Sequence, residues 1–161
     1  MSRYCYLLLL VACFPLDSRP AFAEEGIVVP AIDNPATLKE CGACHFAFPP
    51  QMLPARSWKK LMVNLKSHFG EDASLPEATR ADITAYMVSH AADAPTTENG
   101  QWFLRGLPDN ATPLRITEMP FWRRGHEEVP RSYFTNPQVK TASNCMACHQ
   151  NNGEGTGGDE D

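Results

Sequence analysis

Two short stretches of this sequence place cysteine and histidine at a spacing that can attach a large planar cofactor. Cys41-Gly42-Ala43-Cys44-His45 and Cys145-Met146-Ala147-Cys148-His149 share one pattern, two cysteines three positions apart with a histidine directly after the second. Two thiols at this spacing lie on one turn and can both form thioether bonds to the vinyl groups of a haem, while the histidine faces the iron. The pattern predicts two covalently bound haem c groups, attached through Cys41, Cys44, Cys145 and Cys148, with His45 and His149 as iron ligands.

Other uses of these four cysteines explain the pattern less well. Redox-active thiol proteins carry a single C-x-x-C site on a βαβ framework and need no histidine after it. A zinc site would have to bridge a gap of 100 residues between the two cysteine pairs, far from the usual ribbon spacing. Both trailing histidines would be unexplained in either case.

The first 23 residues resemble an export signal. Arg3 precedes an apolar run from Tyr4 to Phe14, and Ala21-Phe22-Ala23 is typical of a cleavage site. The run has 11 residues, whereas a membrane-spanning helix needs about 20. We therefore expect a periplasmic protein, with a lipid anchor on Cys13 as the alternative because residues 10–13 resemble a lipoprotein box.

Length and charge limit the remaining possibilities. The chain of 161 residues is long enough for one domain or two small ones. Its formal net charge of −5 becomes −6 when Arg3, Arg19 and Asp17 leave with the signal. A sequence-nonspecific nucleic-acid binder is not expected at this charge, so we predict no nucleic-acid partner.

A haem iron that binds one histidine has a second axial position, whose occupant decides between electron transfer and small-molecule binding. His68 lies at the edge of the apolar face of an expected helix that starts at Ser57 and stops at Gly70. His90 closes a second amphipathic stretch, whose expected start is a capping box of Ser74 and Glu77. Periodicity alone leaves both histidines as candidate ligands.

His126 is the third candidate for an axial position. If the chain is helical after Thr117, then Met119 and His126 fall on one side of that helix. Met119 is the rival ligand, although a methionine on an apolar face usually serves packing.

Prolines and glycines between Asp93 and Leu114 break any helical period and suggest a junction. We expect a mainly α fold with two haem units, residues 24–94 and residues 95–161. The first should begin with a helix capped by Asn34 before Cys41 and looks like a small class I cytochrome c core. The second is smaller and irregular, with a disordered acidic tail from about residue 151. Four arginines could pair with haem propionates or form a solvated basic face: Arg115, Arg123, Arg124 and Arg131.

From Cys41 to His149 the sequence resembles the small exported dihaem cytochromes c, which partner an oxygen-binding monohaem cytochrome c in proteobacteria. The resemblance rests on blocks outside the cysteine motifs as well as on the motifs themselves. These blocks are residues 46–50, 53–58, 68–75, 115–117 and 144–149.

The resemblance implies an electron carrier whose two irons are both bound by two histidines. His68 and His126 match the second ligands of the family, whereas His90 matches a place where the family commonly has Asn. It also implies a membrane cytochrome b, linked to quinol, as electron donor and the soluble monohaem cytochrome c as acceptor. The alternatives are a dihaem peroxidase or small-molecule reductase, which would need one iron with an open position, and a redox subunit of a larger dehydrogenase.

Overall fold

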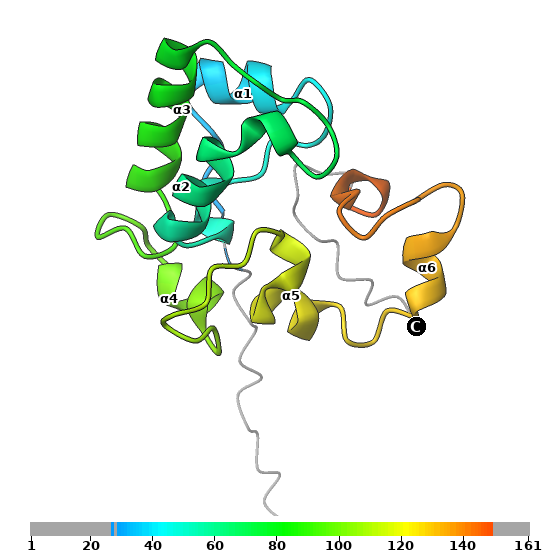
Figure 1. Cartoon of the computed structure of the whole chain (residues 1–161). Coiled ribbons are helices and arrows are strands. Elements are labelled where there is room, and N and C mark those ends of the chain that lie inside the picture. Colours follow the sequence, from blue (N-terminus) through cyan, green and yellow to red (C-terminus); the bar gives the residue numbers. More distant parts are fainter. Residues whose placement is uncertain (1–26, 28, 150–161) are drawn as a thin grey trace, which may run out of the picture.

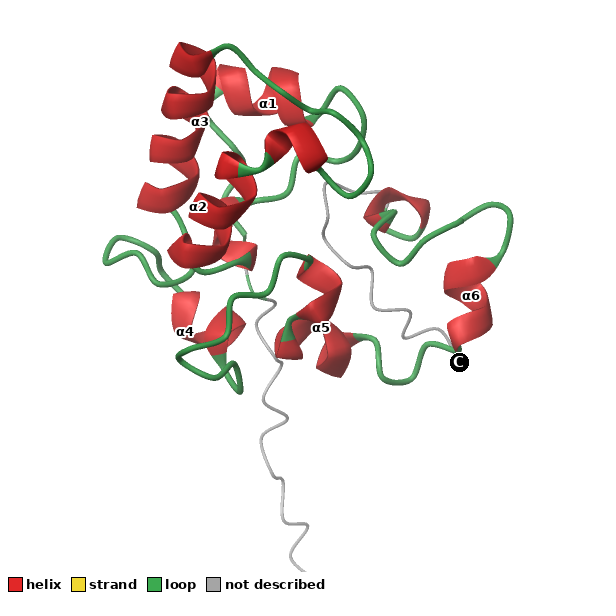
Figure 2. Ribbon diagram, in the orientation of Figure 1, coloured by secondary structure: helices red, strands yellow, loops and turns green. Residues whose placement is uncertain are grey.

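The computed structural model describes residues 27 and 29–149, which form helices joined by loops (Figures 1 and 2). The described residues contain no strand, and an isolated bridge joins His68 to Glu71. The predicted mainly α fold is confirmed. The predicted export signal and the predicted acidic tail lie outside the described residues. Within the described part, no helix is long and apolar enough to cross a membrane. In chain order, with η for a 3-10 helix, the elements are α1 (Pro35–Cys41), η1 (Pro50–Met52), α2 (Ala55–Val63), η2 (Leu65–Ser67), α3 (Glu77–Ser89), α4 (Gly100–Leu104), η3 (Ile116–Glu118), α5 (Pro120–Gly125), α6 (Arg131–Thr135) and η4 (Cys145–Ala147).

Helix α1 begins where the sequence predicts it and ends at the first cysteine of the first motif. The side chain of Asn34 accepts a hydrogen bond from the Thr37 N–H at 2.7 Å, which caps the helix. The amide nitrogen of Asn34 also donates to Asp82 on α3 at 3.3 Å. Helix α3, which packs against both α1 and α2 (Figure 1), therefore helps to set the position of Cys41.

Helix α2 starts earlier and ends sooner than the sequence predicts. Its first N–H, from Ala55, donates to the carboxylate of Asp93 at 2.7 Å, so a residue 38 positions later caps the helix. Ser57 is not the N-cap but lies fully buried inside the helix. The helix stops at Val63, and η2 then leads to a turn at residues 68–71.

The capping box predicted for α3 is also wrong. The helix begins at Glu77 directly after a proline, with no side-chain cap. The N–H of Ser74 donates to Asp72 instead, at 2.9 Å, and the Glu77 carboxylate binds Arg80 at 2.6 Å. These local partners use the Ser74 N–H and the Glu77 carboxylate, two groups that the capping box would have paired with each other.

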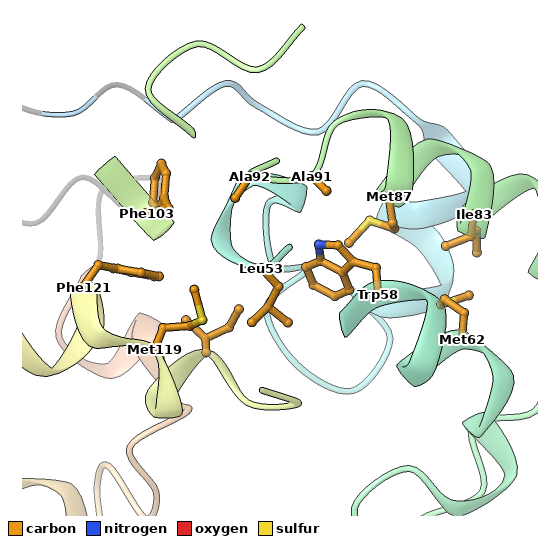
Figure 3. Close-up of a cluster of buried hydrophobic side chains, with 11 residues drawn as sticks. Leu53, Trp58, Met62, Ile83, Met87, Ala91, Ala92, Phe103, Met119 and Phe121 are labelled. Atoms are coloured by element: carbon orange, nitrogen blue, oxygen red, sulfur yellow. The ribbon is translucent and has the colours of Figure 1, made fainter. Parts of the chain in front are cut away.

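One cluster of buried side chains holds the helices together (Figure 3). Figure 3 shows Leu53, which is 1% exposed, between Trp58 and Met119. The cluster takes residues from both sides of the predicted junction at residue 95, and α4 lies within the stretch predicted to be irregular. The division into two haem units stays a prediction. The cluster consists of Leu53, Trp58, Met62, Ile83, Met87, Ala91, Ala92, Phe103, Ile116, Met119 and Phe121.

Replacing Asp93 by Ala should lower the free energy of unfolding by about 1 kcal/mol, because it removes the cap of α2. The same carboxylate lies 3.6 Å from Arg56, but that ion pair is partly exposed and should add little. Denaturant unfolding of the haem-loaded protein measures the change. Asp109→Ala, at an exposed aspartate of the following loop, is the control, and an equal loss in both variants would contradict the capping role.

Candidate haem-binding sites

The first motif leaves helix α1 through a tight turn. Cys41 is the last residue of the helix, and the N–H of Gly42 donates to the Leu38 carbonyl at 3.0 Å. A Cβ atom at Gly42 would collide with that carbonyl oxygen, so the turn requires glycine here. The turn carries Cys44 and His45 out of the helix to an exposed position beside it.

The second motif forms a single turn of its own. The N–H groups of Cys148 and His149 both donate to the carbonyl of Cys145, at 3.1 and 2.8 Å. The side chain of Asn144, just before the motif, donates to the carbonyl of the buried Val139 at 3.0 Å. These bonds hold the two thiols and the histidine on one compact turn.

No disulfide joins the four motif cysteines. Burial raises the pKa of Cys41 and Cys145 above the ordinary thiol value. Among the described residues, no group of three or more His, Cys, Asp or Glu could hold a metal ion. Neither the disulfide nor the zinc interpretation gains support from the geometry of these residues.

His45 of the first motif lies beside His68 from the turn after η2. Their ring centroids are 6.0 Å apart and the ring planes differ by 20°. Two imidazoles that bind one metal at about 2.0 Å each have ring centres roughly 6 Å apart. The Nδ1–H of His45 donates to the Phe46 carbonyl at 2.7 Å, which leaves Nε2 free for a metal.

The second motif has an equivalent pair. The ring centroids of His149 and His126 are 5.9 Å apart, and the ring planes differ by 80°. His126 directly follows α5, and its Nδ1–H donates to the Trp122 carbonyl at 2.8 Å. Its ring also stacks on that of Trp122, with centroids 4.4 Å apart. A helix end and an aromatic ring thus fix the orientation of His126.

The two rival ligands lie elsewhere in the structure. The ring of His90 packs on Tyr86 at 4.5 Å, and its Nδ1–H donates to the Tyr86 carbonyl at 3.0 Å. Met119 is fully buried in the hydrophobic cluster. The structure therefore brings together the four histidines that the sequence predicts as ligands, and it leaves His90 and Met119 apart from them.

Burial lowers the pKa of His68, and the neighbouring His45 and Arg115 lower it further. Burial also lowers the pKa of His149, with a smaller effect from His126. Both imidazoles are therefore neutral at pH 7, which is the form that binds metals.

One feature of the first site has no clear signal in the sequence. Phe69 and Gly70 both have positive φ, 52° and 107°, as the central residues of a type I′ turn do. Two backbone hydrogen bonds between His68 and Glu71, at 2.8 and 3.1 Å, close the turn. Gly70 is visible as a turn residue, but a bulky aromatic side chain is rarely found at positive φ.

The surroundings of both pairs fit a haem. Large apolar side chains are partly exposed beside the motif and ligand residues: Leu38 at 49%, Phe69 at 46% and Met146 at 37%. Such side chains can pack against the flat apolar face of a porphyrin. Cysteine pairs on one turn, paired imidazoles and apolar neighbours together make up the donor set and the surface that a covalently attached haem needs.

The dihaem cytochrome c family model matches residues 37–156. A solved diheme cytochrome c from Rhodobacter sphaeroides is 45% identical, with a TM-score of 0.67 over 74% of this chain and 92% of the other. A second structure from that organism is 41% identical, with a TM-score of 0.59 over 75% and 94%. A diheme cytochrome c of Shewanella baltica is 35% identical, with a TM-score of 0.60 over 76% and 85%. No curated protein matches the chain.

The family match covers most of the chain, including both motifs and all four paired histidines. The similarity to solved structures extends over nearly the whole length of the two Rhodobacter chains. The chain therefore belongs to the dihaem cytochrome c family, and it is an electron-transfer protein with two covalently bound haem c groups rather than an enzyme.

Proposed function

We propose that this protein is a periplasmic carrier of single electrons with two bis-histidine haems. Cys41 and Cys44 would hold the first haem and Cys145 and Cys148 the second. His45 and His68 would bind the iron of the first haem, and His149 and His126 would bind the iron of the second. The observation that carries the proposal is the near-identical separation of the two imidazole pairs, 6.0 and 5.9 Å.

A haem iron with two axial ligands exchanges one electron between its ferric and ferrous forms. The protein's part is to keep both axial positions occupied, so that no substrate reaches the metal. Backbone carbonyls accept the Nδ1–H of His45 and of His126, which fixes both rings. Because methionine ligation raises the potential of a haem, two bis-histidine centres should have lower potentials than His/Met cytochromes.

A membrane cytochrome b linked to quinol would supply the electrons, and an oxygen-binding monohaem cytochrome c would accept them. The family resemblance supports these two partners, and the resemblance of the first 23 residues to an export signal supports the compartment. Neither partner would need a substrate pocket on this chain.

Replacing His68 or His126 by Ala should convert one haem of the two to the high-spin form, because each change removes one axial ligand. Visible spectra of the ferric protein and CO binding to the ferrous protein measure the loss. His90→Ala is the matched control, since this histidine packs on Tyr86 and should leave both haems low-spin. An iron opened by His90→Ala, or none opened by the other two variants, would refute the ligand assignment.

The two ferric haems should give different low-spin electron paramagnetic resonance signals. Imidazole planes 20° apart at the first site split the iron d orbitals more than planes 80° apart at the second. The signal of the second haem should therefore be the more anisotropic one. His126→Ala should remove that signal, while His68→Ala removes the other. Two superimposable signals would contradict the ring geometry.

Electron transfer to an oxygen-binding monohaem cytochrome c should be fast and should weaken with salt if charges steer the encounter. Stopped-flow mixing of the reduced protein with the oxidised partner measures the rate, with a His/Met monohaem cytochrome as the comparison.

The mass of the protein purified from the periplasm checks cleavage after Ala23, the number of haems and any lipid on Cys13. Recovery of the protein from the cytoplasm only, or no transfer to the partner, would refute this part of the proposal.

A further inference from the structure

We propose that Arg115 is a positioning residue for the first haem site and holds His68 in place through the ring of Phe69. The inference rests on the proposed ligation by His68, and it goes further by assigning a role to a residue that binds no iron. Three features support the inference. The turn at Phe69 is strained, the guanidinium group of Arg115 lies over the Phe69 ring, and the backbone of Arg115 is fixed by the hydrophobic core.

The turn that carries His68 is strained. Phe69 has φ of 52°, in the left-handed region where residues with a bulky side chain are rare. The backbone alone would therefore favour a different conformation at this residue. An additional contact is needed to keep the turn closed, and the ring of Phe69 is where such a contact acts.

Arg115 supplies that contact. Its guanidinium carbon lies 4.0 Å from the centre of the Phe69 ring, within the range of a cation–π interaction. The same ring meets His68 edge to face, with centroids 4.8 Å apart. In the part of the chain that the structure describes, no other cation–π contact is present. A direct line of contacts thus runs from Arg115 through Phe69 to the imidazole.

The backbone of Arg115 is fixed by the hydrophobic core. Arg115 precedes η3, and its carbonyl accepts the Glu118 N–H at 3.0 Å. Ile116, the first residue of η3, and Met119, directly after it, are 8% and 0% exposed within the buried cluster. Because the backbone of Arg115 is fixed in this way, its guanidinium group can restrain the exposed turn that carries His68.

A small groove lies between the segment that carries His68 and the segment that carries Arg115. Leu114, directly before Arg115, lines it together with Lys60, His68 and Phe69. Residues 114 and 115 come from beyond the predicted junction, whereas His68 belongs to the first predicted haem unit. A residue of the second segment would thus control a ligand of the first haem.

The consequence is an equilibrium between His68 bound to iron and His68 swung away. A cation–π contact of ordinary strength shifts such an equilibrium by about fivefold. Arg115→Gln should therefore raise the open fraction of the first haem about fivefold, without changing its spectrum when closed. It should also lower the potential of this haem, because a positive charge nearby favours the ferrous form.

Binding of free imidazole to the ferric protein measures the opening, since imidazole enters only when His68 has left. The phase that belongs to the first haem is the one that His68→Ala moves into the dead time. Arg115→Gln should accelerate that phase about fivefold. Phe69→Leu should accelerate it equally, because Leu keeps the unfavourable positive φ but has no aromatic ring for the guanidinium group. The double variant should be no faster than either single one.

Arg123→Gln is the matched control, because it removes the same charge from an exposed arginine of α5. It should leave the imidazole phase of the first haem unchanged. Equal effects of Arg115→Gln and Arg123→Gln, or additive effects of the Arg115 and Phe69 changes, would overturn the inference. If His68→Ala opened no iron at all, the proposed ligation itself would be wrong, which separates the two failures.

Discussion

The proposed bis-histidine ligation places one constraint on the structure: each motif histidine must lie opposite a second imidazole, with room for a single metal ion between them. The partners are 23 residues apart in the sequence in both cases, yet they come from different kinds of structure. His68 comes from a two-residue turn, and His126 comes from the end of a short helix. The rest of the fold serves to bring these four rings to two separations of about 6 Å.

The hydrophobic cluster explains how so small a protein meets this constraint twice. Leu53, Trp58 and Met62 from the first segment pack with Phe103, Met119 and others from the second. Chains of this size bury little surface, so a core shared between both segments is more stable than two separate ones. In the described residues beyond Phe121, Val139 is the one buried hydrophobic side chain. Helix α6 and η4 therefore rely on aromatic contacts of Phe134 and on the haem for apolar surface.

The sequence predicts those parts of the site that depend on neighbouring residues. The cysteine motifs, the Asn34 cap and the candidate histidines could all be found from local spacing. What it misses is set by residues that are distant in sequence. Asp93 caps α2 from 38 positions away, so the local signal at Ser57 was misleading. Phe69 has a positive φ and packs under Arg115, 46 positions later, and no local pattern indicates either feature.

The two sites differ in how firmly their second imidazole is held. His126 donates its Nδ1–H to a helical carbonyl and stacks on Trp122, so its ring has two independent restraints. For His68, the described residues include no hydrogen-bond partner of either ring nitrogen, and its restraint comes from the backbone of the turn and from Phe69. A ring without a hydrogen bond can rotate or leave more easily than one that has it. A carrier that keeps two histidines on each iron must hold the less restrained ligand in place. The side chain of Arg115, over the ring of Phe69, acts at that ligand, where the fold gives the least support.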